Sequence, residues 1–342
     1  MSHIVDNYKH YMGSHCSSTL ISNVLKYNGL DISEELCFGI GAGLGFVYRK
    51  AFNPPLYFVL GRADDIEEKV MYCLGGMAIP YTTDNDQTAW KQLTSSIDHG
   101  NPAIINVDAS CLEYLRKKFN LFDHVRYGGH RVLVLDYSNE KKTVTVADYL
   151  WSQYQTVSIE HLQNARSSQD GQMSADNLMY TLLLPGRYFS IKDAIISGIR
   201  MNVKTMSQPW FDLIGLSGVG KFCDRVLTWP RLMKEEDIKK NAYMVYMMLE
   251  VVGTGGGNFR RLYARFLREA NEYLGSKTIR KAIEVYSELG RLWKEVALLF
   301  KISSEDVTKG IWAGTEKNKI LLEQIKKYEN NGIMLLQDYL NE

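Results

Sequence analysis

One cysteine in the sequence occupies a position that favours a nucleophile. Cys16 lies in the segment GSHCSST, directly before residues 17–27, whose apolar side chains recur at helical spacing. Unpaired amides and the helix dipole at a helix N-terminus favour an anion, and such a position lowers the pKa of a thiol. A buried, inert cysteine is the alternative, and the position of Cys16 alone does not decide between the two.

A histidine and an aspartate mark the ends of two adjacent predicted strands. His130 opens the strand HRVLVLDYS after two glycines, which let the backbone approach a site closely. Asp148 ends the next strand, in TVTVADY, after the short polar turn NEKK. If the two strands pair as a hairpin, Asp148 can hold the His130 imidazole in the tautomer that a base needs. Taken singly, His130 is more simply a turn histidine and Asp148 a strand end, but the order Cys, His, Asp favours nucleophilic catalysis.

The composition excludes several classes of protein. The chain has 342 residues and a formal net charge of +1, so its length predicts two domains and its charge gives no global field to attract nucleic acid. The N-terminus has no apolar signal core, and no window approaches the ~18 uncharged apolar residues of a membrane span. The five cysteines are odd in number and form no C-x-x-C pair. We therefore expect a reduced, cytoplasmic protein that has no cofactor or metal and binds neither nucleic acid nor membrane.

The elements that must position these residues fall into two parts. The sequence before Pro185-Gly186 mixes helices and strands, and from about residue 190 onward it is almost entirely helical in pattern. We predict an α+β protein: residues 1–186 form a domain with a helix packed on an antiparallel sheet, and residues 187–342 form a mainly α-helical domain. The predicted helices of the first part are 17–27, 65–75, 86–98 and 158–166, and its predicted strands are 55–61, 102–108, 130–138, 143–149, 154–158 and 177–185. Asp31 or Ser33 can also cap a second short helix, with Glu34 and Glu35 in its first turn.

Three glycine-rich segments resemble phosphate or ligand loops only in part. Residues 215–222, GLSGVGKF, have Phe222 where a phosphate-binding loop needs Ser or Thr for magnesium, so nucleotide binding is not expected. Residues 39–46, GIGAGLGF, lack the dinucleotide-binding spacing and are expected to form a flexible loop. Residues 253–259, GTGGGNF, predict a helix break followed by Asn258 as a helix cap.

The sequence also resembles a known family in three blocks. SHCSSTLISNVLKYNGLDISEELCFGIGAGLGF is similar to the opening of the butirosin biosynthesis protein H family, and GGHRVLVLDYSNEKKTVTVADY is similar to its second block. GGGNFRRLYARFLREA, residues 255–270, resembles a motif of the accompanying helical region. The resemblance implies a papain-like cysteine fold and the transfer of an aminoacyl group from an acyl-carrier protein to an amine of an aminoglycoside.

Carried over by position, the resemblance makes Cys16 the nucleophile, His130 the base and Asp148 the acid that orients the base. Papain-like enzymes usually supply an oxyanion donor from a glutamine a few residues before the cysteine, and this sequence has none there. Besides the Cys16 amide, the substitute donors that we consider are the side chains of His10, Ser14 and His15.

One more acid is a candidate for substrate binding. Asp108 follows the predicted strand 102–108 near the same layer of the sheet. It either binds an amine substrate or caps a turn, and we favour the cap.

These residues lead to three hypotheses. The first is an acyltransferase of specialised-metabolite (antibiotic) biosynthesis, which moves an acyl or aminoacyl group from an acyl-carrier protein or other thioester donor, through a Cys16 thioester, to a small amine-bearing acceptor. The second is a cysteine peptidase or amidase on the same scaffold. The third is a non-catalytic binding protein in which the three residues are vestigial or structural.

Overall fold

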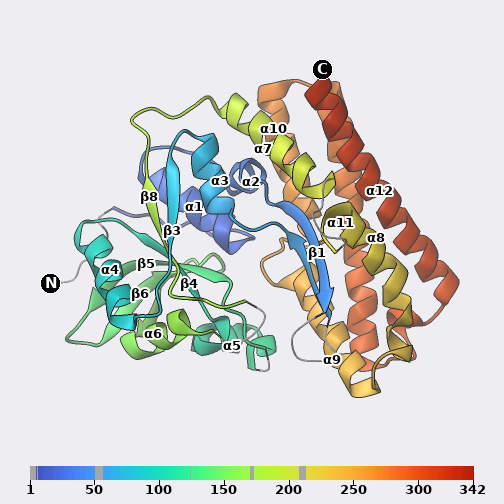
Figure 1. Ribbon diagram of the computed structural model, residues 1–342, viewed down its shortest axis with the longest axis horizontal. Helices are drawn as coiled ribbons and strands as arrows, with labels where there is room; N and C mark the ends of the chain where they lie inside the picture. The colour runs from blue at the N-terminus through green and yellow to red at the C-terminus, as the bar shows by residue number, and fades with distance from the viewer. Residues whose placement is uncertain (1–4, 6, 51–56, 124, 170–172, 208–212) are drawn as a thin grey trace. The chain divides into compact units, whose positions relative to one another are not determined.

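The chain forms two compact units in the computed structural model (Figure 1). One comprises Met1–Cys37 and Gly75–Tyr188, and we call it the sheet unit. The other comprises Phe38–Leu74 and Phe189–Glu342, and we call it the helical unit. The structure describes residues 5, 7–50, 57–123, 125–169, 173–207 and 213–342.

A six-stranded antiparallel sheet with the strand order β3-β8-β4-β5-β6-β7 forms the centre of the sheet unit. Its strands are β3 (Met77–Tyr81), β4 (Ala103–Val107), β5 (His130–Ser138), β6 (Thr143–Ala147), β7 (Gln155–Ser158) and β8 (Met179–Leu183). Strand β4 and most of β5 are buried, as their continuous apolar runs predict. The predicted hairpin is confirmed, because β5 and β6 pair antiparallel.

Helices cover this sheet (Figure 1). They are α1 (Cys16–Tyr27), α4 (Asp86–Asp98), α5 (Glu113–Lys118) and α6 (Ile159–Ser167). Helix α1 packs against β5 and buries the apolar side chains that gave its helical period. It ends before Gly29, whose φ of +86° lies in the left-handed region that favours glycine. Helix α2 (Glu34–Ile40) begins in the sheet unit and ends in the helical unit.

The helical unit is built around α11 (Lys277–Glu305), which contacts α9, α10 and α12. Its other helices are α3 (Ile66–Cys73), α7 (Ile191–Ser207), α8 (Gly215–Arg225), α9 (Glu235–Tyr246), α10 (Arg260–Leu274) and α12 (Thr315–Asn341). A two-stranded antiparallel sheet of β1 (Leu44–Lys50) and β2 (Tyr57–Arg62) packs against α8 through β1. The predicted strand 55–61 is thus found as β2, with its first two residues outside the described ones.

Two of the glycine-rich segments differ from expectation. The loop predicted over 39–46 is mostly regular structure, because α2 extends to Ile40 and β1 begins at Leu44. Gly45 lies within β1, where a Cβ would come 2.5 Å from the backbone nitrogen of Ala63, so glycine here serves close packing. The prediction of Asn258 as a cap is wrong: the residue before α10 is Phe259, in a left-handed conformation and without a side-chain capping bond. The third segment, 215–222, forms the first turns of α8.

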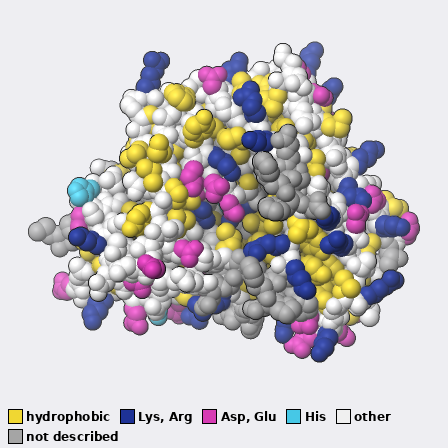
Figure 2. Space-filling view, viewed as in Figure 1, with side chains coloured by type: hydrophobic (Ala, Val, Ile, Leu, Met, Phe, Trp, Pro, Cys, Tyr) yellow, Lys and Arg dark blue, Asp and Glu magenta, His cyan; other side chains and the backbone are white. Residues whose placement is uncertain are grey.

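The edge strand β3 was not predicted from the sequence. It pairs with β8, and Met77, Ile79 and Tyr81 are 55%, 40% and 38% exposed. Figure 2 shows hydrophobic side chains gathered over β3 and β8. Because most of β3 is exposed, its sequence lacks the alternation of buried and exposed residues that identifies a half-buried strand.

The predicted α+β class is confirmed, with antiparallel sheets in the N-terminal part and mainly helices in the C-terminal part. The division into domains 1–186 and 187–342 stays a prediction. The compact units differ from it in one respect, because residues 38–74 group with the C-terminal helices. Within the described ranges, no helix is both long and apolar enough to span a membrane.

Candidate functional site

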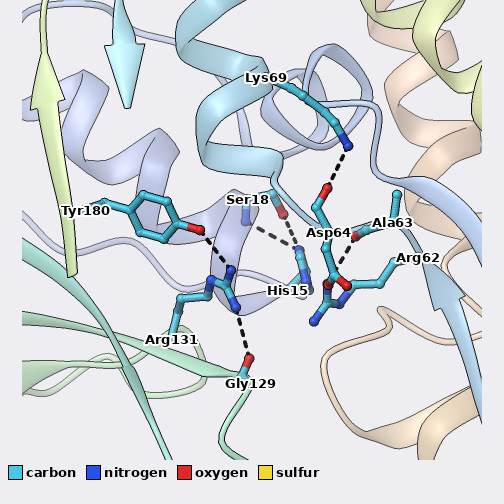
Figure 3. Close-up of polar contacts among 9 residues, drawn as sticks. All are labelled: His15, Ser18, Arg62, Ala63, Asp64, Lys69, Gly129, Arg131 and Tyr180. Carbon is cyan, nitrogen blue, oxygen red and sulfur yellow. Dashed lines mark hydrogen bonds and ion pairs between the residues drawn. The ribbon is translucent and has the colours of Figure 1, made fainter. Parts of the chain in front are cut away.

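Cys16 is the first residue of α1, as the sequence predicted. The helix is capped by His15, whose Nδ1 accepts a hydrogen bond from the Ser18 amide and lies 3.1 Å from Ser18 Oγ (Figure 3). The Cys16 side chain is 6% exposed. Its thiol therefore lies at the N-terminus of a helix, in a nearly dry environment that strengthens electrostatic interactions.

The segment before Cys16 is held by a carboxylate from α2. Glu34 accepts hydrogen bonds from the backbone amides of Ser14 and His15, at 2.8 and 2.7 Å. Burial raises the pKa of Glu34, and these amide bonds act in the opposite direction. A Cβ on Gly13 would lie 2.7 Å from Glu34 Oε2, so glycine there leaves room for the carboxylate. Glu34 thus fixes the backbone that leads into the nucleophile position.

His130 is the first residue of β5 and pairs with Val107 of β4. Its Nε2 lies 2.8 Å from Asp148 Oδ2, which leaves Nδ1 for the hydrogen bond with the Cys16 side chain. Burial alone would lower the pKa of His130, but the charge and hydrogen bond of Asp148, together with Cys16, raise it to about 10. The structure thus brings the three residues together within the sheet unit, where Asp148 and Cys16 favour the charged form of the imidazole.

The glycines before His130 allow a close backbone contact. A Cβ on Gly128 would come 2.5 Å from the backbone nitrogen of Ala175, and the Gly128 amide donates to the Met173 carbonyl. The glycine pair therefore lets the backbone before His130 lie close to residues 173–175 of the same unit.

Asp148 follows β6 and is fully buried. Its Oδ2 accepts hydrogen bonds from both His130 Nε2 and the Tyr114 hydroxyl, at 2.8 and 2.9 Å. Its backbone carbonyl accepts from His10 Nε2 at 3.0 Å. The carboxylate is thereby oriented toward the imidazole, as a residue that fixes a histidine tautomer must be.

The three side chains considered as oxyanion donors have distinct surroundings. The His10 ring bonds through Nε2 to the Asp148 carbonyl, and burial lowers the pKa of His10. The backbone amides of Ser14 and His15 are engaged by Glu34, and the His15 ring faces Ser18. A role for any of the three in binding an oxyanion stays a prediction.

Asp108 is fully buried and belongs to a local network. It accepts from the Ser110 amide and hydroxyl, from the Tyr127 amide and from Ser168, and it pairs with Arg126 at 3.0 Å. Burial raises the pKa of Asp108, but these bonds outweigh it, and the net direction is down. The capping alternative accounts for these contacts, since Asp108 caps the short helix Ala109–Cys111. Amine binding by Asp108 stays a prediction.

A separate cavity of about 540 Å³ lies between α4 and the strands β3 and β8. Its lining includes Ile79, Tyr81, Lys91 and His99, and none of Cys16, His130 and Asp148 lines it. We therefore do not assign it to the chemistry of these three residues.

Sequence reasoning missed two contributors to the site. Tyr114 lies in YLRKKF, where Arg116, Lys117 and Lys118 are exposed. Glu34 was expected only as an acid in the first turn of a helix. An aromatic residue in a basic helix was the available signal for Tyr114, but its partner lies 34 residues away in the sequence.

Two family comparisons cover most of the chain. Residues 15–149 match the family described as "Butirosin biosynthesis protein H, N-terminal", which confirms the resemblance stated from the sequence. Residues 160–336 match the family described as "Domain of unknown function (DUF4872)". No curated protein matches the sequence.

Proposed function

Because the chain belongs to the family described as "Domain of unknown function (DUF4872)" and its N-terminal part matches that of butirosin biosynthesis protein H, we propose that it is a cysteine-dependent acyltransferase of specialised-metabolite biosynthesis. The second match implies a biosynthesis-related acyltransferase activity. In our proposal the donor is a thioester, carried by an acyl-carrier protein or another thiol, and the acceptor is a small amine. A cytoplasmic location belongs to the proposal, because thiols stay reduced there.

One observation carries the proposal. His130 bonds to both Asp148 and Cys16, and the thiol stands at the N-terminus of α1. A raised histidine pKa beside a thiol favours the imidazolium–thiolate pair, which is the reactive form of a cysteine nucleophile. An ion pair with a purely structural role can also shift the pKa of a histidine, but such a pair does not require a thiol beside the histidine.

The first half of the reaction forms an acyl-enzyme. The Cys16 thiolate attacks the thioester carbonyl carbon, and the C–O double bond becomes a single bond to an oxyanion. When the carbonyl reforms, the bond to the carrier sulfur breaks, and His130 donates its proton to the departing thiolate. The acyl group is then bound to Cys16 as a new thioester, and His130 is neutral.

The second half transfers the acyl group to the amine. The amine nitrogen attacks the Cys16 thioester, and His130 accepts the proton that the nitrogen loses. Cleavage of the C–S bond releases the amide and regenerates the Cys16 thiolate. Asp148 keeps the imidazole oriented in both halves and stabilises its charged form.

The oxyanion needs donors in both halves. We assign the Cys16 amide as the first donor, because it lies at the N-terminus of α1. The second donor is among His10, Ser14 and His15, and each is testable by substitution. Loss of one such donor typically reduces the rate about 10²–10³-fold.

The experiment is to trap the acyl-enzyme. The protein is incubated with acyl thioesters of a small thiol, and intact-mass spectrometry with peptide mapping locates any adduct. We expect one acyl group on Cys16, its loss in Cys16→Ala, and its retention in Cys111→Ala, because Cys111 is a more exposed thiol than Cys16 but lies outside the site.

Discharge then separates transfer from hydrolysis. Primary amines added to the trapped adduct should yield the amide faster than water yields the acid. An adduct that forms equally on Cys16→Ala contradicts the nucleophile assignment. An adduct on Cys16 that only water discharges makes the protein a cysteine amidase or peptidase instead.

A further inference from the structure

The carboxylate of Asp148 is shared between two donors. His130 Nε2 and the Tyr114 hydroxyl both bond to Oδ2, at 2.8 and 2.9 Å. Oδ1 is buried and has no hydrogen-bond partner within the described ranges. The negative charge of this buried group is thus balanced at one oxygen, by one titratable ring and one hydroxyl.

The tyrosine is well suited to remain a donor. Burial raises the pKa of Tyr114 well above its ordinary value, and the Asp148 charge raises it further. The hydroxyl therefore stays protonated throughout the pH range in which the His130 ring titrates. The Tyr114 ring packs edge-to-face on Trp151 at a centroid distance of 5.0 Å and lines a cavity of about 230 Å³. Removal of the hydroxyl alone leaves this packing in place.

Resting on the proposed function, we propose that Tyr114 is a positioning residue that divides the charge of Asp148, so that His130 can release its proton during acyl transfer. Without the Tyr114 hydroxyl, the buried Asp148 carboxylate would depend on His130 for its stabilisation. It would then hold the imidazolium more strongly, because an unpaired buried charge is costly. The Tyr114 hydroxyl supplies part of that stabilisation by a charge-assisted hydrogen bond.

The consequence falls mainly on the second half of the reaction. In the acyl-enzyme the thiolate charge of Cys16 is gone, and His130 must be neutral to accept the proton of the amine. A histidine held too strongly in its charged form is a poor base for that step. Tyr114 thus favours amine attack, whereas attack of the Cys16 thiolate on the donor depends on it less.

Three other titratable groups face the pair from neighbouring segments. Cys16 bonds to His130 from the start of α1, and His10 donates to the Asp148 carbonyl. The ring of Tyr149 lies 5.9 Å from that of His130. Tyr114→Phe removes one oxygen and none of these groups, so a changed titration of His130 reports the lost hydrogen bond.

The test is a direct titration of the His130 ring by NMR, in a Cys16→Ser background that imitates the uncharged sulfur of the acyl-enzyme. His130→Gln identifies the signal. We expect Tyr114→Phe to raise the titration midpoint by about one pH unit, the order of effect that a hydrogen bond to a charged group supplies. An unchanged or lowered midpoint overturns the proposal.

Two comparisons sharpen the result. Tyr137→Phe is the matched control, because the Tyr137 hydroxyl bonds to Asp98 Oδ1 at 2.9 Å away from the site. It should leave the midpoint unchanged. If Tyr114 acts through Asp148, Tyr114→Phe should have no effect on the midpoint in an Asp148→Asn background, and an effect that persists there contradicts the proposal.

Kinetics on the whole chain with Cys16 intact completes the test. Tyr114→Phe should slow amine discharge of the acyl-enzyme several-fold at neutral pH and change its formation less. Equal losses in both steps would contradict charge division. The NMR titration needs no donor, so a shifted midpoint without any acyl transfer would reject the proposed function and not the role of Tyr114 toward His130.

Discussion

Among the residues that the structure describes, each unit buries one pair of oppositely charged side chains, and the two pairs are built differently. In the sheet unit, His130 and Asp148 are joined at 2.8 Å, with 7% and 0% of their side chains exposed. In the helical unit, Arg260 of α10 and Glu329 of α12 are joined at 2.7 Å, and both are fully buried. Distance and burial alone do not distinguish the two.

The partners of the pairs do distinguish them. Arg260 Nη1 donates to the backbone carbonyls of Gly45, Gly61 and Asn258, and Trp293 donates to Glu329 Oε1. Arginine keeps its charge at all working pH values, so this pair cannot exchange a proton in a reaction. Its contacts link β1, β2 and α12 and are among those that join residues 38–74 to the C-terminal helices.

The His130 pair has a titratable cation, a thiol on one side and a hydroxyl on the other. A buried ion pair therefore indicates chemistry only where one member can change charge beside a group that can react. Substitutions test this difference. Those at the His130 pair should reduce activity, whereas those at the Arg260 pair should reduce stability and leave the reactivity of Cys16 unchanged.

The largest effect is expected from Asp148→Asn. The amide preserves size but cannot hold the imidazolium, so acyl-enzyme formation should fall by about 10³–10⁴-fold, as when a triad carboxylate is replaced. Single-turnover acylation followed by mass spectrometry measures this loss. Retention of full activity would show that Asp148 has no catalytic function.

The next effect is expected from Glu329→Gln. It leaves the Arg260 charge buried without its partner, and breaking a buried pair in this way costs about 3–5 kcal/mol. Denaturant unfolding measures the loss, while alkylation of Cys16 in the folded protein should keep its rate.

The double variant Arg260→Met with Glu329→Met serves as the control for this loss. Removing both charges should recover part of the stability but not all of it, because three carbonyls lose their donor. Full stability in Glu329→Gln would contradict a structural role for the pair. Breaking the exposed pair Lys117–Glu113 should give no resolvable change in the free energy of unfolding.

The sequence predicts the His130 pair better than the Arg260 pair. The register of β5 against β6 followed from two apolar runs and a short turn, and it put His130 and Asp148 at one end of neighbouring strands. Tyr114 could not be found in this way, because it reaches Asp148 from a helix without a shared periodic pattern. The Cys16 position was predictable, because an N-terminal helix boundary is a local feature.

The helical unit shows where local patterns stop being informative. Its helices were predictable from their three- and four-residue spacing, but the packing of residues 38–74 against them depends on contacts over about 200 residues of sequence. The prediction of Asn258 as a helix cap was wrong for the same reason. Asn258 is fully buried beside Gly61, and a Cβ on Gly61 would come 1.8 Å from Asn258 Oδ1. Tertiary packing there replaces the local cap.

Taken per pH unit, the smallest effect is expected from pH, and it concerns only the titratable pair. The folded pKa of His130 is about 10, above its ordinary 6.5, so the folded state retains a proton that the unfolded state loses. The contribution of His130 to stability is therefore complete below about pH 6.5 and is lost as the pH rises toward 10, with a slope of at most about 1.4 kcal/mol per pH unit. Denaturant unfolding of wild type and His130→Gln across this range measures it as their difference, because the Arg260 pair and the tyrosines contribute equally to both proteins. The difference in unfolding free energy could instead stay constant between neutral pH and pH 10, or grow in favour of the wild type. Either result would mean that His130 is neutral in the folded state. Only the contacts of His130, and not its charge, would then resemble those of a catalytic pair.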